Sequence, residues 1–196
     1  CGFTSVGDLP AIGEISLMEL KSTIIGLFGS SGSGKTLTCQ KLVRALRARG
    51  FQCCGFVSPA VFVGTDKTAI KVQWLENDTE RLLMTPLTEE SQLVVGRWQI
   101  HLDAFEWINR NLADLKGCQA FFCDEIGPLE VLQGRGWIKA LEIVDERKYE
   151  LNVITFRPSL RDYFRQRFPD LVVYDLDNQG DGEKAIRDVI NLFGIG

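Results

Sequence analysis

The amino-acid sequence predicts a three-layer α/β fold, in which helices cover both faces of a mostly parallel sheet of about five strands. Three observations lead to this prediction. Short apolar runs alternate with helix-like segments from residue 22 onward, an order that is typical of βαβ units. A glycine-rich loop separates the first apolar run from the first helix-like segment. Residues 60–101 instead show strand-like alternation, which indicates a β-ribbon insertion beside the main sheet.

Length and charge limit the function classes. With 196 residues, the chain is long enough for one domain with a substantial core. We expect a single domain over residues 22–196 and, before it, a leader over residues 1–21 that is at most partly ordered and carries no assigned chemistry. The net charge of −4 lacks the basic excess of an extended nucleic-acid surface. No apolar run reaches the length of a membrane span, so no membrane association is predicted.

The first βα unit contains the most informative motif of the chain. The apolar run from Ile24 to Phe28 is typical of a buried strand. Gly50 can cap the end of the helix that follows. The apolar side chains of that helix recur at helical spacing, at Cys39, Leu42, Val43 and Leu46. Between strand and helix, Gly29-Ser30-Ser31-Gly32-Ser33-Gly34-Lys35-Thr36 matches the phosphate-binding pattern G-x-x-x-x-G-K-[ST].

The chemistry of this loop assigns roles to its residues. Glycines let backbone N–H groups turn inward and form an anion cradle at a helix N-terminus. Lys35 would reach the β- and γ-phosphates, and Thr36 would offer its hydroxyl to Mg²⁺. The alternative is a glycine- and serine-rich turn that merely caps a helix. Because strand, loop and helix occur in the required order, we predict nucleotide-phosphate binding.

The remaining elements follow in order. A second strand is predicted from Phe51 to Ser58. In the insertion, apolar and more polar residues alternate through Ile70, Val72 and Trp74, and a return strand is predicted from Arg81 to Met84. A capping box at Asp103 opens a helix that stops near Gly117. After it we expect strands at residues 120–123, 151–155 and 171–174 and helices at residues 137–148, from 159 to before 169, and 183–193.

Two carboxylates end the strand that begins at Ala120. In this class of fold, a strand-end Asp holds Mg²⁺ through its water shell, which is the role we predict for Asp124. The following Glu125 is placed to orient or deprotonate a water that attacks the γ-phosphate. The alternative for Glu125 is a solvated carboxylate at a strand end. The combination with the phosphate-binding loop favours the catalytic interpretation.

Two arginines are candidates for stabilising charge on the γ-phosphate. Arg157 follows a predicted strand at the edge where α/β sheets bind ligands. Its alternative role is a surface ion pair with an acid such as Glu130. Arg135 lies between two glycines and is the second candidate. The single His101 has no partner for nucleophilic catalysis and is interpreted as structural or solvated.

The six cysteines show neither a C-x-x-C pair nor metal-ligand spacing with the single histidine. Several lie in apolar runs, where cysteine behaves as a small hydrophobe. We therefore expect reduced thiols, without a zinc site or a disulfide framework. Reduced thiols and nucleotide chemistry both favour a cytoplasmic location.

The stretch Asp124-Glu125-Ile126-Gly127-Pro128-Leu129-Glu130, taken with the glycine loop, resembles the small P-loop nucleoside-triphosphatases, described from thermophiles and as cancer-related NTPases. The likeness begins near Ser22 and includes Gly55-Phe56 and Arg157-Pro158. It implies a P-loop NTPase fold and slow Mg²⁺-dependent hydrolysis of several nucleoside triphosphates. One departure is Ser58-Pro59-Ala60-Val61, where many members carry Thr-x-Glu-x-Arg. The other is a leader that is longer than usual for the family.

The predicted function is Mg²⁺-dependent hydrolysis of ATP, GTP and other nucleoside triphosphates to the diphosphate and phosphate. Glu125, Lys35 and Arg157 are the predicted catalytic residues, and Thr36 and Asp124 the metal-binding ones. Two alternatives remain open. A P-loop kinase would pass the γ-phosphate to a small acceptor, with residues 61–97 as acceptor site or lid. A nucleotide-operated switch would act on a protein partner, which the sequence does not identify.

Overall fold

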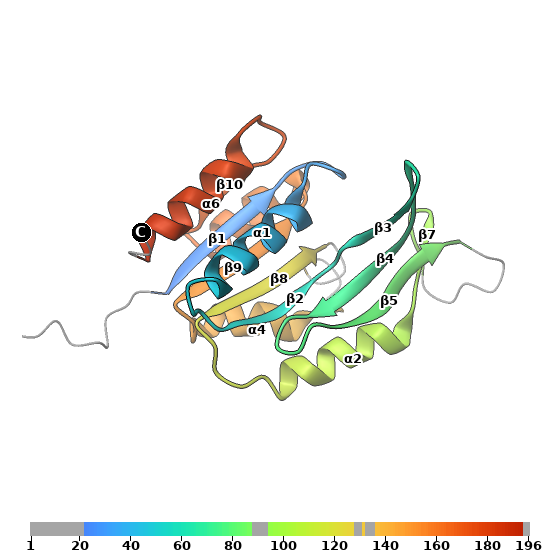
Figure 1. Ribbon diagram of the computed structural model, residues 1–196, viewed down its shortest axis with the longest axis horizontal. Coiled ribbons are helices and arrows are strands. Elements are labelled where there is room, and N and C mark those ends of the chain that lie inside the picture. Colours follow the sequence, from blue (N-terminus) through green and yellow to red (C-terminus); the bar gives the residue numbers. More distant parts are fainter. Residues whose placement is uncertain (1–21, 88–93, 128–130, 132–135, 194–196) are drawn as a thin grey trace, which may run out of the picture.

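The computed structural model describes residues 22–87, 94–127, 131 and 136–193 (Figure 1). Ten strands of this described part form one sheet, in the order β10-β1-β9-β8-β2-β4-β5-β7-β6, with β3 paired to β4. No helix within these ranges is long and apolar enough to cross a bilayer.

The centre of the sheet is parallel, as predicted. Strand β1 pairs with β10 and β9, β9 pairs with β8, and β8 pairs with β2, all in parallel. Five strands therefore point their carboxyl ends to the same edge. They are β1 (Thr23–Phe28), β2 (Cys53–Val57), β8 (Ala120–Ile126), β9 (Leu151–Phe156) and β10 (Val172–Asp175).

The insertion is the main difference from the predicted fold. The predicted antiparallel ribbon is present, but β4 pairs with β2, opposite Phe56 and Val57, so the sheet continues into the insertion and has more strands than predicted. The outer edge of β2 would otherwise expose unpaired N–H and C=O groups, and β4 satisfies them. We call this part the antiparallel extension. It consists of β3 (Ala60–Val63), β4 (Asp66–Trp74), β5 (Thr79–Pro86), β6 (Val94–Val95) and β7 (Trp98–Ile100).

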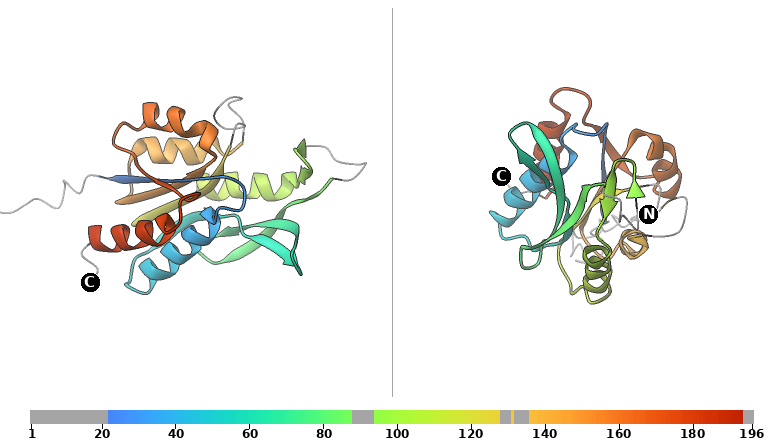
Figure 2. Two further views of the ribbon diagram at one scale, coloured as in Figure 1. Left: turned by 90° about the horizontal axis from the view of Figure 1, so that it is seen from above. Right: turned by 90° about the vertical axis from the view of Figure 1, so that its right-hand side faces the viewer.

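Helices cover both faces of the sheet (Figures 1 and 2). On one face lie α1 (Lys35–Arg47) and α6 (Asp181–Leu192), over a core that includes Ile25 and Leu27 of β1. On the other face, Ile24 and Phe28 belong to a second core beneath the remaining helices. These are α2 (Leu102–Ala113), α4 (Ile138–Glu146), the short 3₁₀ turn η1 (Pro158–Leu160) and α5 (Arg161–Arg167). The alternation of β1 side chains between the two cores produces the predicted three layers.

Gly55 allows β2 to approach β8 closely. Its φ of 89° lies in the left-handed region, which favours glycine. A Cβ at this position would lie 2.0 Å from the carbonyl oxygen of Phe122 in β8. Since no side chain fits there, the position requires glycine, and the close approach brings the end of β2, with Ser58, beside the end of β8.

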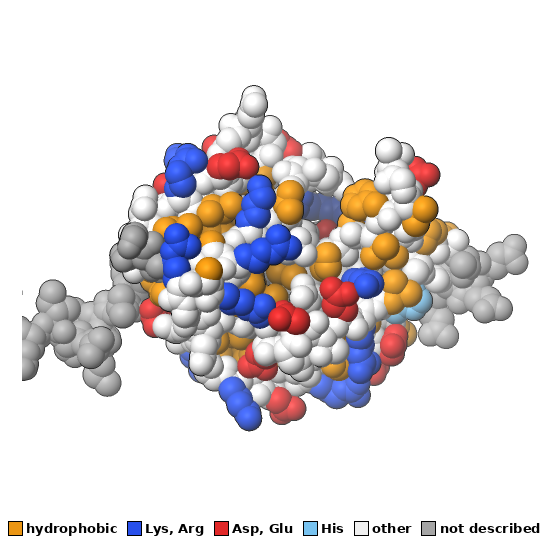
Figure 3. Space-filling view, in the orientation of Figure 1, with side chains coloured by type: hydrophobic (Ala, Val, Ile, Leu, Met, Phe, Trp, Pro, Cys, Tyr) orange, Lys and Arg blue, Asp and Glu red, His pale blue; other side chains and the backbone are white. Residues whose placement is uncertain are grey.

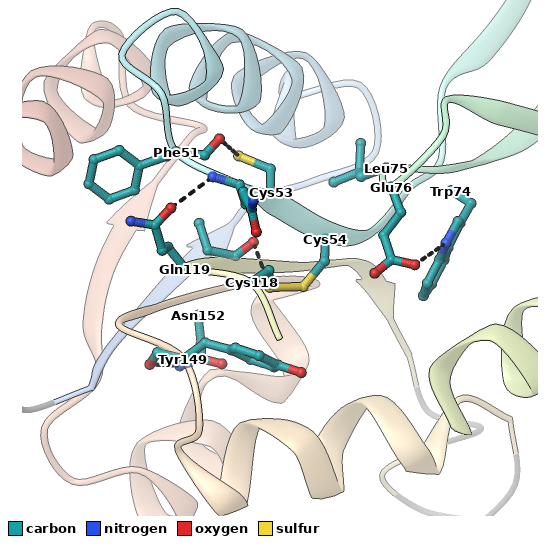
Figure 4. The surroundings of a disulfide bond; sticks show 12 residues. Phe51, Cys53, Cys54, Trp74, Leu75, Glu76, Cys118, Gln119, Tyr149 and Asn152 are labelled. Atoms are coloured by element: carbon teal, nitrogen blue, oxygen red, sulfur yellow. Dashed lines mark hydrogen bonds between the residues drawn. A yellow bond between two sulfur atoms is a disulfide. The ribbon is translucent and has the colours of Figure 1, made fainter. Parts of the chain in front are cut away.

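A disulfide joins Cys54 of β2 to Cys118, which precedes β8 (Figure 4). The expectation that all cysteines are reduced was therefore wrong for this pair. The two residues are 64 positions apart in the sequence, and only the pairing of β2 with β8 brings their Cα atoms to 6.0 Å. Among the described residues, Cys39, Cys53 and Cys123 are not disulfide-bonded, and they are buried in the way predicted for small hydrophobes.

Candidate active site

The predicted functional residues meet at the carboxyl edge of the parallel strands. The loop that begins at Gly29 follows β1, and Asp124 and Glu125 lie near the end of β8. Arg157 follows β9 directly, and Asp177 comes shortly after β10. Open α/β sheets bind their ligands at this edge. In Figure 3, acidic and basic side chains lie in a recess between the surface over α1 and the apolar surface over the antiparallel extension.

The phosphate-binding loop ends where α1 begins. Gly34 caps the helix with a φ of 93°, a left-handed conformation that glycine adopts without steric cost. Helix α1 starts at Lys35, so its positive dipole end and free N–H groups point to the loop. Thr36, the second residue of this helix, is half-buried. This local geometry is that of an anion cradle.

The Lys35 ammonium group folds back over the loop. Its Nζ atom donates hydrogen bonds to the carbonyl oxygens of Gly29 and Ser30, at 2.8 and 2.7 Å. Burial lowers the pKa of Lys35, and the charges of Glu125, Asp124 and Asp177 oppose that shift. The lysine is therefore central to the charged cluster at this edge.

Asp177 contacts the start of the loop from the opposite side. Its carboxylate accepts hydrogen bonds from the backbone N–H of Ser30, at 2.9 Å, and from the Ser30 hydroxyl, at 2.6 Å. The hydroxyl hydrogen bond, with that of the N–H, holds the pKa of Asp177 below its ordinary value. A carboxylate of the chain thus binds a loop amide of the kind that binds phosphate.

The Asp124 carboxylate is fully buried and held on both sides. One oxygen accepts from the backbone N–H of Ser58 at 2.9 Å, and the other accepts from the hydroxyl of Thr155 at 2.7 Å. Beside it, the hydroxyl oxygen of Ser58 is buried and has no hydrogen-bond partner in the described structure. Three parallel strands, β2, β8 and β9, therefore fix the position of one carboxylate.

Glu125 has an unusual backbone conformation. Its φ is 69°, a region that non-glycine residues rarely adopt, and the register between β8 and β9 shifts at this point. The N–H of Glu125 donates to the Thr155 hydroxyl at 2.7 Å. Strain of this kind, held by a specific contact, is typical of functional sites. Burial raises the pKa of Glu125, and the nearby Asp124 adds to the shift.

Arg157 belongs to the same cluster. It lines one cavity together with Lys35 and Glu125, and its charge lowers the pKa of both. The second candidate, Arg135, and the proposed ion-pair partner Glu130 lie outside the described residues. His101 lies between β7 and α2, and its Nε2 atom is 3.0 Å from the hydroxyl of Thr85 in β5.

Sequence reasoning assigned no role to Ser58 or Thr155, and it named Asp177 only as the start of a loop that is expected to contact the base. Each lies at the carboxyl end of a parallel strand or just after it. That position was a usable signal for Thr155, which immediately precedes Phe156 and Arg157. No motif marks any of the three, since their partners in this site are 30 or more positions away in the chain.

A parallel sheet, a glycine loop at the start of α1 and two carboxylates at a strand end define a protein with a P-loop nucleotide-binding fold. The sequence profile of the NTPase family matches residues 24–188. The chain belongs to this family.

Two curated relatives are nucleoside-triphosphatases named THEP1. The protein of Sulfurisphaera tokodaii is 25% identical over 155 residues, which cover 79% of this chain and 88% of the relative. The protein of Ignicoccus hospitalis is 29% identical over 107 residues, which cover 55% of this chain and 60% of the relative.

Two solved structures share the fold. The human cancer-related nucleoside triphosphatase superposes with a TM-score of 0.64 at 19% identity, over 88% of this chain and 97% of its own. THEP1 from Aquifex aeolicus also gives a TM-score of 0.64 at 19% identity, over 87% of this chain and 98% of its own. These likenesses confirm the predicted P-loop NTPase fold.

Proposed function

We propose that the protein hydrolyses nucleoside triphosphates to the diphosphate and phosphate in a Mg²⁺-dependent reaction. The observation that carries the proposal is the half-buried Glu125 carboxyl group, which lines the same cavity as the lysine of the phosphate-binding loop. The names of the curated relatives support the same activity. The roles below are assigned to the residues of this chain on that basis.

The loop would bind the triphosphate through its backbone N–H groups at the start of α1. Lys35 would exchange its two carbonyl partners for β- and γ-phosphate oxygens. The same loop would also bring the positive charge of Lys35 to the point where the leaving diphosphate develops negative charge. Binding and charge stabilisation therefore come from one segment.

The residues present fit a magnesium ion next to the phosphates. The described residues include no cluster of three or more acidic, His or Cys side chains that could hold a metal alone. Mg²⁺ with a nucleotide needs only one or two protein ligands, because phosphate oxygens and waters supply the rest. Thr36 and Asp124 would hold it, and the buried, unpartnered Ser58 hydroxyl lies beside Asp124, where it could bind a water of the metal's shell. When bound, the ion neutralises charge on the β- and γ-phosphate oxygens.

Glu125 would accept the proton of the attacking water. A carboxylate whose pKa is raised by burial is a better proton acceptor near neutral pH than an exposed one. Thr155 fixes the Glu125 backbone, so the carboxyl group is held in place before the water arrives. Arg157, on the next strand, would stabilise charge on the γ-phosphate.

Two further expectations rest on the same site. The segment from Asp177 to Gly182, which ends in the first turn of α6, contacts the start of the phosphate-binding loop through the bond of Asp177 to Ser30, so we expect it to contact the base. A triphosphate substrate favours a cytoplasmic protein. The cysteine pattern no longer adds support for that location, since Cys54 and Cys118 are bonded.

The proposal is tested by single-turnover hydrolysis of pre-bound Mg·ATP, with GTP, CTP and UTP in parallel. Glu125→Gln keeps the side-chain shape but removes the proton acceptor, and we expect turnover to fall by roughly 10²–10⁴-fold with nucleotide affinity almost unchanged. Glu106→Gln, at an exposed position of α2, is the matched control. Phosphate release by Glu125→Gln at the parent rate would move the catalytic role to another residue. A parent protein that releases no phosphate with any of the four nucleotides would refute the function.

A further inference from the structure

A cavity of about 200 Å³ adjoins the phosphate-binding loop on the side of the antiparallel extension. Lys35, Glu125 and Arg157 form its polar end. The opposite wall is apolar and comes from β4, β5, β7, α2 and the residue that precedes α4. Ile70, Met84, Trp98, Phe105 and Trp137 belong to this wall. A mainly apolar cavity with a few convergent polar groups is the usual form of a small-molecule site.

The apolar wall is built by residues that face one another. Ile70 of β4 and Met84 of β5 are directly paired across the two strands, so both side chains point to the same face of the sheet. Trp137 stacks on Phe105, with ring centroids 4.9 Å apart and an angle of 22° between the ring planes. The wall therefore presents aromatic and aliphatic surface that packing holds in place.

The phosphates and base of a nucleotide do not account for this wall. The phosphate-binding loop reaches from Ser30, which Asp177 contacts, to Lys35. The proposed base contacts lie on the Asp177 side, after β10, whereas the apolar wall lies beyond Lys35 and Glu125, on the extension. The cavity thus adjoins the γ-phosphate position from the side opposite to the base.

The charges at the polar end select the kind of ligand. Lys67 also lines the cavity. A bound triphosphate would neutralise the charges of Lys35 and Arg157, and the positive charge of Lys67 and the negative charge of Glu125 would then remain as a pair. The ammonium group of Lys67 also lies 5.5 Å from the centroid of the Trp98 ring, at the boundary with the apolar wall. A hydroxyl group can accept from an ammonium and donate to a carboxylate, whereas an anionic ligand would be repelled by the triphosphate.

We infer that this cavity binds a small neutral aromatic alcohol, with its ring against Ile70, Met84 and the stacked aromatic residues and its hydroxyl beside Glu125. The inference rests on the proposed nucleotide site, because that site supplies the polar end. A cavity of about 150 Å³ holds benzene, so the volume here suits one ring with a short substituent. The bound hydroxyl occupies the position of the attacking water, and the ligand therefore slows phosphate release.

Benzyl alcohol is the probe, and ligand-observed NMR measures its binding to the full chain with and without Mg²⁺ and a non-hydrolysable ATP analogue. A ligand of this size is expected to bind with a Kd of about 1 mM. Met84→Trp fills the cavity and should weaken binding by about tenfold or more. The matched control is Leu82→Trp on the same strand, since Leu82 pairs with Lys71 on the other face and is 42% exposed. It should leave binding and basal hydrolysis unchanged.

Two comparisons make the inference refutable even if Met84→Trp does not fold. Met84→Ala enlarges the cavity and should increase the affinity for 2-naphthylmethanol several-fold over the parent; equal affinities would overturn the site. Benzoate should bind more weakly than benzyl alcohol when the nucleotide analogue is present, and equal binding would overturn the ligand class. Unchanged phosphate release at saturating benzyl alcohol would overturn the position of the hydroxyl.

Failure of the proposed function gives a different result. A parent protein that hydrolyses no nucleotide would refute that function, while the titration of the nucleotide-free protein still reports on the cavity. Benzyl alcohol that binds the parent and Met84→Trp equally would refute the cavity, while hydrolysis without ligand remains as proposed.

Discussion

Thr155→Val should separate the contribution of one hydroxyl group from that of the side-chain shape. Thr155 is fully buried in β9. Its hydroxyl donates to the carboxylate of Asp124 and accepts from the N–H of Glu125, both at 2.7 Å. Valine has nearly the same shape but can make neither hydrogen bond. Two buried polar groups would therefore lose their partner in a single substitution.

The expected loss of stability follows from these two groups. Each buried group left without a partner costs about 1–3 kcal/mol, so the sum for the two groups is about 2–6 kcal/mol. For a chain of this length, each kcal/mol lowers the Tm by about 2–4 °C, which predicts a fall of about 4–24 °C. Thr155→Ser keeps the hydroxyl and loses one methyl group, at a cost of only about 1 kcal/mol.

The same substitution should affect turnover. Without the Thr155 hydroxyl, nothing in the described structure holds the Glu125 N–H. The backbone of Glu125 can then relax from its φ of 69°, a conformation that costs about 1–2 kcal/mol. We expect single-turnover hydrolysis to fall by about tenfold or more, the change that corresponds to about 1.4 kcal/mol.

Differential scanning calorimetry and single-turnover hydrolysis on the parent, Thr155→Val and Thr155→Ser provide the measurement. The serine variant should resemble the parent in turnover, whereas the valine variant should not. If the valine variant keeps the stability and activity of the parent while the serine variant loses both, the methyl group and not the hydroxyl is what matters. The positioning role of Thr155 would then be refuted.

Three further predictions concern the charged cluster. Lys35→Ala should abolish productive triphosphate binding in calorimetric titration and leave the fold intact by circular dichroism, because the Lys35 ammonium group bonds only to the loop; unchanged affinity would refute the phosphate site. Asp124→Asn should raise the Mg²⁺ concentration needed for half-maximal hydrolysis, since one negative charge is removed; overlapping Mg²⁺ titrations of mutant and parent would place Asp124 away from the metal. Because burial raises the pKa of Glu125 in the folded protein, the stability linked to its protonated form is present at acid pH and lost as pH rises through the raised pKa. The difference between the Tm of Glu125→Gln and that of the parent should therefore increase in favour of the variant as pH rises. A difference that stays constant across a pH series would contradict the burial of the carboxyl group.

The sequence predicted the elements that local patterns control. The strand-loop-helix unit around Gly34 and Lys35 has its own glycine and apolar signals, and these predicted both its structure and its place in the fold. The five parallel strands followed from short apolar runs between helices. The position of Arg157 beside Lys35 followed from the rule that parallel strands share a carboxyl edge.

Local sequence patterns could not predict the contacts between segments that are distant in the chain. The pairing of β2 with β4 depends on the free edge of β2, which no local pattern shows. The Cys54–Cys118 bond and the hydrogen bonds of Thr155 join residues that are 64 and about 30 positions apart. The left-handed backbone of Glu125 is likewise set by its neighbour strand and not by its own residue type.

The hydrogen bonds within the phosphate-binding loop have a consequence for which anions can enter it. Lys35 already has two carbonyl partners and Ser30 already has the carboxylate of Asp177. An arriving anion must therefore displace internal partners on both sides of the loop before it gains any. Inorganic phosphate offers only a few oxygens for that exchange, whereas a triphosphate can replace both sets at once and add its metal. These internal hydrogen bonds therefore favour a ligand with several phosphate groups over a single small anion.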